Sequence, residues 1–151
     1  MVSLARSERS FNSVTAYINA GGRGTRLNST FRPDPEYGIA KALLEVGAPS
    51  IKLVDHHINR LGSVAFRNIV VGAGDLSSVA AHVQDRYECN TVVDAFSTND
   101  HSQLGTGGDL IVALHSRPEL FGTQILINNV DTILDLDNVE FVRRHLGNRS
   151  N

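Results

Sequence analysis

A glycine-rich segment directly after a short apolar run constrains the fold of this chain more than any other feature. The segment reads Ala20-Gly21-Gly22-Arg23-Gly24-Thr25-Arg26-Leu27, and the run before it is Val14-Thr15-Ala16-Tyr17-Ile18. The run is rich in β-forming residues, so we expect a strand that ends near Asn19 and delivers the loop. Because glycine lacks a Cβ, successive N–H groups of such a loop can converge on phosphate oxygens. The pattern predicts an anion-binding loop at the ligand-binding edge of an α/β sheet.

Strand and helix patterns then alternate to the end of the chain. We expect further strands at 68–72, 91–96 and 124–130, and helices after Pro49, after Asp75, after the glycine run at 105–108 and over 139–146. The strands are too short and too continuously apolar to face water. This alternation predicts an α/β fold of the three-layer, Rossmann-like kind, with a mostly parallel sheet and helices on both faces.

Apolar residues at helical spacing indicate which faces of the helices point inward. The expected inward residues are Ile51, Val54, His57, Ile58 and Leu61 in the first helix, Leu76, Val79, Ala80 and Val83 in the second, and Leu110, Ile111 and Leu114 in the third. Gly62 and Pro118 would end the first and third helices. His56 and His57 are neighbours in the first helix and point in different directions, so they cannot share a metal ion. His82 has no second ligand four residues away, which favours a structural role.

Composition narrows the class of protein. The chain has 151 residues, 41% of them apolar, and a formal net charge of −2, which describes one domain with an ordinary core. Its 14 Lys and Arg are spread among 16 Asp and Glu, so we expect no nucleic-acid partner. Residues 1–13 read as a polar arm without the apolar core of a signal peptide, and no later stretch is long enough to cross a bilayer. With a single cysteine, these features predict a cytoplasmic protein without a membrane partner, whose oligomeric state stays open.

The glycine loop does not match the two most familiar phosphate-binding motifs. The P-loop requires Gly-Lys-Ser/Thr at its end and the dinucleotide fingerprint requires Gly-x-Gly-x-x-Gly, and neither is present. The stretch from Gly21 to Leu27 instead resembles Gly-Gly-x-Gly-Thr-Arg-Leu, the signature of the sugar-1-phosphate nucleotidyltransferases. The likeness continues in Lys41-Ala42-Leu43-Leu44-Glu45-Val46-Gly47, which is similar to Pro-Lys-x-Leu-x-x-Val-Gly, in 104–108, which is similar to Leu-Gly-Thr-x-Gly, and in Asp131, which is similar to the aspartate of Asn-Gly-Asp.

This resemblance implies a reaction, a metal ion and a set of site residues. Members of the family transfer a nucleoside monophosphate from a nucleoside triphosphate to a sugar-1-phosphate, giving a nucleotide-sugar and pyrophosphate. By this likeness Arg26 stabilises the pyrophosphate, Lys41 neutralises the α-phosphate and Asp131 holds Mg²⁺. The implied nucleotide-binding residues are Ala20, Gly21, Gly22, Gly24, Thr25, Gln103, Gly105 and Thr106. GTP is slightly favoured, because 105–108 and 131–132 look most like guanylyltransferases for mannose- or heptose-type sugars.

Four positions depart from the family's motifs, namely Asn19, Ala40, Asp109 and Val130. Val130 replaces the glycine before the aspartate, where a branched side chain would crowd the triphosphate if it faced the site. The likeness covers nearly the whole chain but only the N-terminal part of a family member, without its sugar-binding half. Three functions therefore stay open. They are a nucleotidyltransferase, a non-catalytic nucleotide-binding or assembly module, and a glycosyltransferase-like nucleotide-sugar binder, the last disfavoured because such folds lack this loop.

Overall fold

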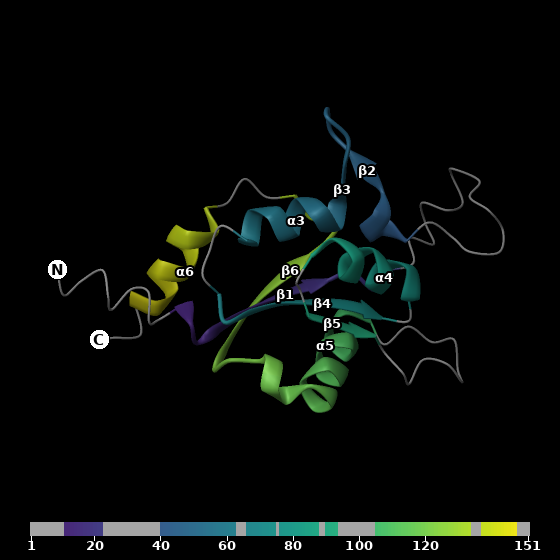
Figure 1. Ribbon diagram of the computed structural model, residues 1–151. Helices are drawn as coiled ribbons and strands as arrows, with labels where there is room; N and C mark the ends of the chain where they lie inside the picture. Colours follow the sequence, from purple (N-terminus) through teal and green to yellow (C-terminus); the bar gives the residue numbers. More distant parts are fainter. Residues whose placement is uncertain are drawn as a thin grey trace.

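The computed structural model describes residues 11–22, 40–62, 66–74, 76–87, 90–93, 105–133 and 137–147. These residues form an α/β fold with one parallel sheet and a small hairpin (Figure 1). The sheet strands are β1 (Val14–Asn19), β4 (Asn68–Gly74), β5 (Asn90–Val93) and β6 (Gln124–Asn129), and the hairpin strands are β2 (Glu45–Val46) and β3 (Ile51–Lys52). The helices are α3 (Leu53–Gly62), α4 (Ser77–Arg86), α5 (Gly105–Ser116) and α6 (Asn138–Gly147), with 3-10 helices η1 (Lys41–Leu43) and η3 (Pro118–Leu120).

The order of strands in the sheet reverses at β1. The described strands lie in the order β5-β4-β1-β6, and each neighbouring pair is parallel. β4 and β5 follow β1 in the chain and extend the sheet on one side of it, whereas β6 adds to the other side. Since all four strands run in one direction, their carboxyl ends share one edge. In open α/β sheets the crevice at the carboxyl ends, where the strand order reverses, is the usual ligand site.

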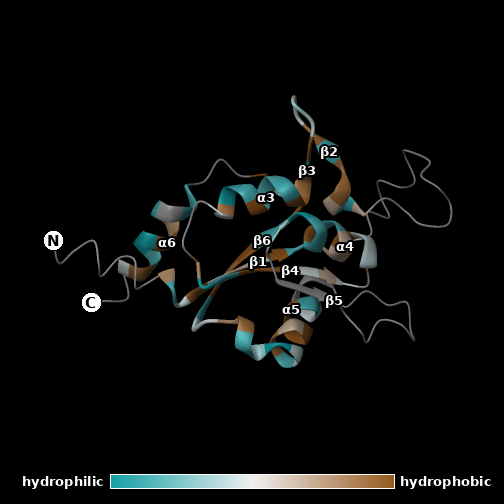
Figure 2. Cartoon of the chain, viewed as in Figure 1, coloured by the Kyte–Doolittle hydropathy of each residue, from teal (hydrophilic) through white to brown (hydrophobic). Residues whose placement is uncertain are grey.

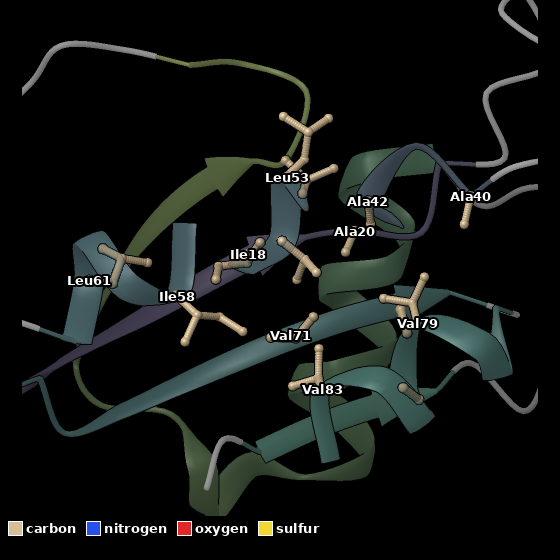
Figure 3. Packing of buried hydrophobic residues seen from close by; sticks show 14 of the residues in the cluster. Ile18, Ala20, Ala40, Ala42, Leu53, Ile58, Leu61, Val71, Val79 and Val83 are labelled. Carbon is tan, nitrogen blue, oxygen red and sulfur yellow. The ribbon is translucent and has the colours of Figure 1, made fainter. Parts of the chain in front are cut away.

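The main hydrophobic core lies between the sheet and the helices α3 and α4 (Figure 3). Side chains alternate between the faces of a strand, and Ala16 and Ile18 of β1 both point into this core. Val71 of β4 joins them from the neighbouring strand. The helices contribute Val54, Ile58 and Leu61 from α3, and Val79, Ala80 and Val83 from α4. The inward residues predicted at helical spacing within α3 and within α4 are thus confirmed.

A second cluster covers the opposite face of the sheet. It contains Tyr17 and Val70, which alternate with the residues of the main core, and Ala113 of α5. Leu120 of η3 completes it, and its carbonyl accepts a hydrogen bond from Thr15 Oγ1 at 3.1 Å. Figure 1 shows α5 on the side of the sheet away from α3 and α4. Helices therefore pack against both faces of β1 and β4.

The strand β6 is less covered than its sequence predicts. Hydrophobic residues line β1 and β6, and hydrophilic residues cover much of α3 (Figure 2). However, Ile127 of β6 is 49% exposed, because α5 packs over β1 and β4 and leaves this position open. The expectation that all strands are shielded from water is wrong for β6. The helix α6 covers only the beginning of β1 and β6, where Val142 packs with Phe11 and Val14.

Two predicted helix starts also need correction. Pro49 does not open a helix, because it lies in the turn between β2 and β3, and α3 begins only at Leu53. Ile51 pairs with Val46 in the hairpin and is a strand residue. The glycine run at 105–108 was expected as a turn before the third helix, but it forms the first turn of α5 itself.

The inward face of α5 differs from the prediction in part. Leu110 packs against the second cluster as predicted, whereas Ile111 is 57% exposed and Ala113 is buried. Leu76 stands at the N-cap position before α4 rather than inside it, while its side chain still packs against the main core. Asp75, expected to cap α4, lies outside the described residues. Within the part of the chain that the structure describes, no helix has the length and apolar character needed to cross a bilayer.

Candidate functional site

Backbone hydrogen bonds bring three separate segments together at the carboxyl end of β1. The amide of Ala20 donates to the carbonyl of Gly72 at 2.8 Å, and the amide of Val130 donates to the carbonyl of Asn19 at 3.1 Å. These two bonds continue the sheet ladder beyond β1 on both sides. The amide of Lys41 donates to the carbonyl of Gly22 at 3.3 Å, which ties η1 to the glycine loop.

Lys41 and Asp131, which lie 90 residues apart in the chain, form an ion pair at this edge. Lys41 Nζ donates to Asp131 Oδ2 at 3.0 Å. The Lys41 side chain runs beside Gly22, where an added Cβ would lie 3.8 Å from Lys41 Cδ, an ordinary contact distance. The two side chains are 22% and 48% exposed, so a ligand can reach both charges. The sequence placed both residues at one edge, and the structure brings them into direct contact.

Asp131 carries a negative charge at neutral pH. The hydrogen bond from Lys41 and the Lys41 charge hold the pKa of this carboxyl below its ordinary value, and partial burial opposes them only in part. A depressed carboxyl pKa means that the pair stabilises the fold above the ordinary pKa and loses this contribution as the pH falls through the lowered value. Thr132 Oγ1 lies 3.4 Å from Asp131 Oδ1 and is a further donor. The ionised carboxylate is suited to binding a cation.

Val130 does not crowd this edge. Its side chain is 4% exposed and belongs to the main core, so the branched group points inward. His57 of α3 lies beneath it and forms a hydrogen bond with the Val130 backbone. Burial, with the neighbouring His56, lowers the pKa of His57, while that hydrogen bond and the charge of Asp131 oppose the change. A neutral, buried imidazole therefore supports the segment that carries Asp131.

Two other segments approach Gly21 closely. A Cβ on Gly21 would lie 2.7 Å from Asp109 Oδ2, the end of a side chain that can move, and 3.0 Å from the backbone of Gly74, a tighter contact than most Cβ atoms make. The loop after β1 thus passes directly over the end of β4. This packing explains a glycine at position 21 without any ligand, and it also places the Asp109 carboxylate of α5 against the loop.

The residues present fit a Mg²⁺ ion held jointly with a nucleotide rather than by protein alone. Among the described residues, no three His, Cys, Asp or Glu side chains gather as a metal cluster. Mg²⁺ commonly keeps several waters and binds one or two carboxylates together with substrate phosphates. Asp131, a single exposed carboxylate, is the kind of protein ligand that such a site needs.

The structure describes part of the predicted site. Ala20, Gly21, Gly22, Lys41 and Asp131 meet at the edge described above. Gly24, Thr25, Arg26 and Gln103 lie outside the described residues, and Gly105 and Thr106 are the first two residues of α5.

Sequence reasoning did not assign His57 or Asp109 to the site. Asp109 and Asn19 were visible only as departures from the family's motifs. Asn19 Nδ2 donates to Asn129 Oδ1 at 3.4 Å, which links the ends of β1 and β6. For Asn19 and Asp109 the sequence therefore gave a signal, a mismatch to a motif, but it did not indicate which residues each one contacts.

A groove of about 620 Å³ lies elsewhere, along β6 and α6. Its lining residues are Val14, Thr123, Gln124, Ile125, Leu126, Ile127, Phe141, Val142 and His145. None of the predicted site residues is among them.

A scan against protein-family models finds none that matches this chain, and a search of curated proteins finds no similar sequence.

Proposed function

We propose that the carboxyl edge of the sheet binds a nucleoside triphosphate and supports transfer of its nucleotidyl group to a sugar-1-phosphate. The Lys41–Asp131 pair carries this proposal, because it joins a fixed positive charge and a carboxylate at the point where the strand order reverses. The backbone hydrogen bond from the Lys41 amide to the Gly22 carbonyl joins this pair to the glycine loop. The family resemblance of the two glycine motifs and of Lys41 is independent support.

The chemistry requires positive charge more than a reactive side chain. An oxygen of the sugar phosphate forms a bond to the α-phosphorus while the bond from that phosphorus to the pyrophosphate oxygen breaks. Negative charge then increases on the transferring and leaving groups, so fixed positive charge lowers the barrier. Asp131 would hold Mg²⁺, which neutralises phosphate charge when bound. When nucleotide is bound, the Lys41 ammonium would donate to a phosphate oxygen in place of the Asp131 carboxylate.

We include in this proposal a three-layer, Rossmann-like architecture, a nucleotide-binding domain that starts at residue 14, and a cytoplasmic location. The parallel sheet and the helices packed on both faces of β1 and β4 support the architecture. GTP is the favoured nucleotide, on the similarity of 105–108 to guanylyltransferases.

A non-catalytic nucleotide-binding module is the second candidate function. The direct bond between Lys41 and Asp131 favours it, since each charge already has a partner and the pair holds η1 to the end of β6 without a ligand. Measurement of pyrophosphate release with a panel of sugar-1-phosphates distinguishes the two functions. Release above background supports a transferase, and nucleotide binding without release supports the module.

Calorimetric titration of GTP with and without Mg²⁺ tests the site itself. We expect Mg²⁺ to strengthen binding to the wild-type chain by at least about tenfold, the equivalent of one charge-assisted contact. Asp131→Asn should remove this Mg²⁺ effect, and Lys41→Met should weaken binding under both conditions. Asp85→Asn, which removes the same charge from an exposed position of α4, is the matched control and should behave as wild type.

Two outcomes would contradict the proposal, and each points to a different error. If the wild-type chain binds no nucleotide, the edge is not a nucleotide site. If Asp131→Asn keeps the full Mg²⁺ effect while thermal melting shows an intact fold, Asp131 does not hold the ion.

A further inference from the structure

Val130, the residue before Asp131, is held through its amide, its carbonyl and its side chain. The amide donates to the carbonyl of Asn19 at 3.1 Å, which extends the pairing of β1 with β6. The side chain is buried in the main core. The carbonyl, which belongs to the peptide bond that leads into Asp131, has His57 of α3 as its partner. The chain therefore enters Asp131 in one fixed direction.

The imidazole of His57 is the donor in this hydrogen bond. Burial lowers the pKa of His57 and the bond opposes the change, as a bond donated by the ring to a carbonyl does. Nε2 of the ring is buried and has no partner among the described residues, so Nδ1 is the donating nitrogen. His57 is 7% exposed, and water screens such a bond poorly. The place of this one donor decides how the peptide bond before Asp131 is oriented.

The Asp131 side chain has a second constraint, which the proposed function gives up. Lys41 Nζ donates to Asp131 Oδ2 at 3.0 Å in the structure without a ligand. When nucleotide is bound, the Lys41 ammonium would donate to a phosphate oxygen instead. The direction of the carboxylate then depends chiefly on the backbone that carries it. The contact between His57 and Val130 is thus most important in the state that binds the metal ion.

We propose that His57 is a positioning residue, which aims the Asp131 carboxylate at Mg²⁺ by fixing the peptide bond between Val130 and Asp131. This inference rests on the proposed function, because it concerns the ion that Asp131 would hold there. Groups that orient a metal ligand change the affinity for the metal although they do not touch it. In this role His57 contacts only the backbone. Its loss should weaken the Mg²⁺-dependent part of nucleotide binding and leave the part that needs no metal.

Calorimetric titration of GTP with and without Mg²⁺ tests this role, at a temperature at which each variant is folded. We expect Mg²⁺ to strengthen binding to the wild-type chain by at least about tenfold, and His57→Leu to reduce this effect to within about threefold. Binding without Mg²⁺ should be unchanged. His82→Leu is the matched control, because it also removes a largely buried histidine, one that bonds to Asp55 and Lys52 rather than to Val130. That variant should be less stable and keep the Mg²⁺ effect.

Two amide substitutions distinguish a donor in the right place from a side chain that is only polar. The side-chain NH₂ group of asparagine can occupy the place of Nδ1 of histidine, so His57→Asn should keep most of the Mg²⁺ effect. Glutamine carries its amide one bond farther, near the place of Nε2, so His57→Gln should lose the effect. This comparison decides the matter even if His57→Leu does not fold.

Each outcome answers one question. A Mg²⁺ effect that His57→Leu and His57→Gln both retain overturns the role of His57 while leaving the nucleotide site in place. Equal loss of the effect in His57→Asn and His57→Gln, or in His57→Leu and His82→Leu, also overturns it, because the position of the donor is then not the cause. Absence of any Mg²⁺ effect in the wild-type chain overturns the proposed metal site, and the role of His57 with it.

Discussion

At the scale of single residues, Gly72 shows how a close contact fixes a residue type inside a strand. A Cβ at this position would overlap the hydroxyl oxygen and Cζ of Tyr17 on the neighbouring strand. Tyr17 is fully buried and cannot swing away without opening the cluster around Val70 and Ala113. Glycine at position 72 is thus a packing requirement, although glycine weakens a strand in general.

Gly72→Ala should therefore destabilise the protein by about 1–3 kcal/mol, as expected for an overpacked core. The free energy of unfolding, measured by urea titration, is the test. Gly62→Ala is the matched control, because nothing lies within 4 Å of a Cβ at the end of α3. That variant should keep or raise stability by up to about 1 kcal/mol, since alanine favours helix more than glycine does. Equal losses in both variants would show that the Tyr17 contact is not the cause.

Sequence predicted some site residues and not others for a physical reason. Lys41 and Asp131 were predictable, because the carboxyl ends of parallel strands meet at one edge and a motif marked each residue. The contact of Asp109 with Gly21 was not, since it depends on how closely α5 approaches the sheet. Such an approach is set by packing between elements far apart in the chain. The inward orientation of Val130 likewise depends on the space left by α3.

At the scale of secondary-structure elements, a buried polar network joins α3, α4 and β3. His82 Nε2 lies 2.8 Å from Asp55 Oδ1, and the two side chains are 11% and 6% exposed. Lys52 Nζ lies 3.4 Å from His82 Nδ1. Because the lysine ammonium can only donate, Nδ1 of a neutral ring accepts and Nε2–H donates to Asp55. Tyr87, whose pKa is raised by burial and by Asp55, adds a hydrogen bond to the same carboxylate.

His82→Leu should cost about 2–4 kcal/mol of unfolding free energy, because it leaves Asp55 buried without its main partner. Replacing Asp55 and His82 together by leucine should restore part of the loss, since the buried carboxylate is then removed as well. Chemical denaturation of the three proteins measures both effects. Glu140→Gln, which breaks exposed pairs with Arg143 and Arg144, should cause no measurable change. A small loss for His82→Leu would mean that water reaches Asp55 and that the network contributes little.

Element boundaries were the weaker part of the sequence prediction. The strand β1 over Val14–Asn19 was predicted with its observed limits, whereas β4 extends two residues beyond the predicted 68–72 and β6 ends one residue before the predicted 130. The hairpin was missed because each of its strands has two residues, too few to show a period. Gly47, with a φ of +80°, was the available turn signal. The glycine run at 105–108 was predicted as a turn but is helical. Packing and the apolar residues that follow override the low helix propensity of glycine.

At the scale of the whole molecule, β6 forms an edge of the described sheet that lacks the usual protection. β6 pairs only with β1 among the described strands, and its sequence Gln124–Asn129 contains neither a charged residue nor a proline. Charges and prolines are the usual devices that prevent edge strands from pairing with other chains. Ile127 and Phe141 are 49% and 47% exposed, and both line the groove of about 620 Å³ along this edge. Strand order and edge exposure are properties of the assembled sheet, so the apolar pattern of β6 alone predicted an interior strand.

Ile127→Lys should therefore reduce self-association of the protein, because a lysine on the edge strand opposes pairing with a second β6. Light scattering during slow heating and sedimentation over a range of concentrations measure the effect, and the variant should scatter less at equal melting temperature. Ile111→Lys is the matched control. Ile111 is 57% exposed on α5, so this substitution adds the same charge away from the edge. If the two lysine variants reduce association equally, the change in net charge is responsible. If neither does, the β6 edge is not the surface through which the chains meet.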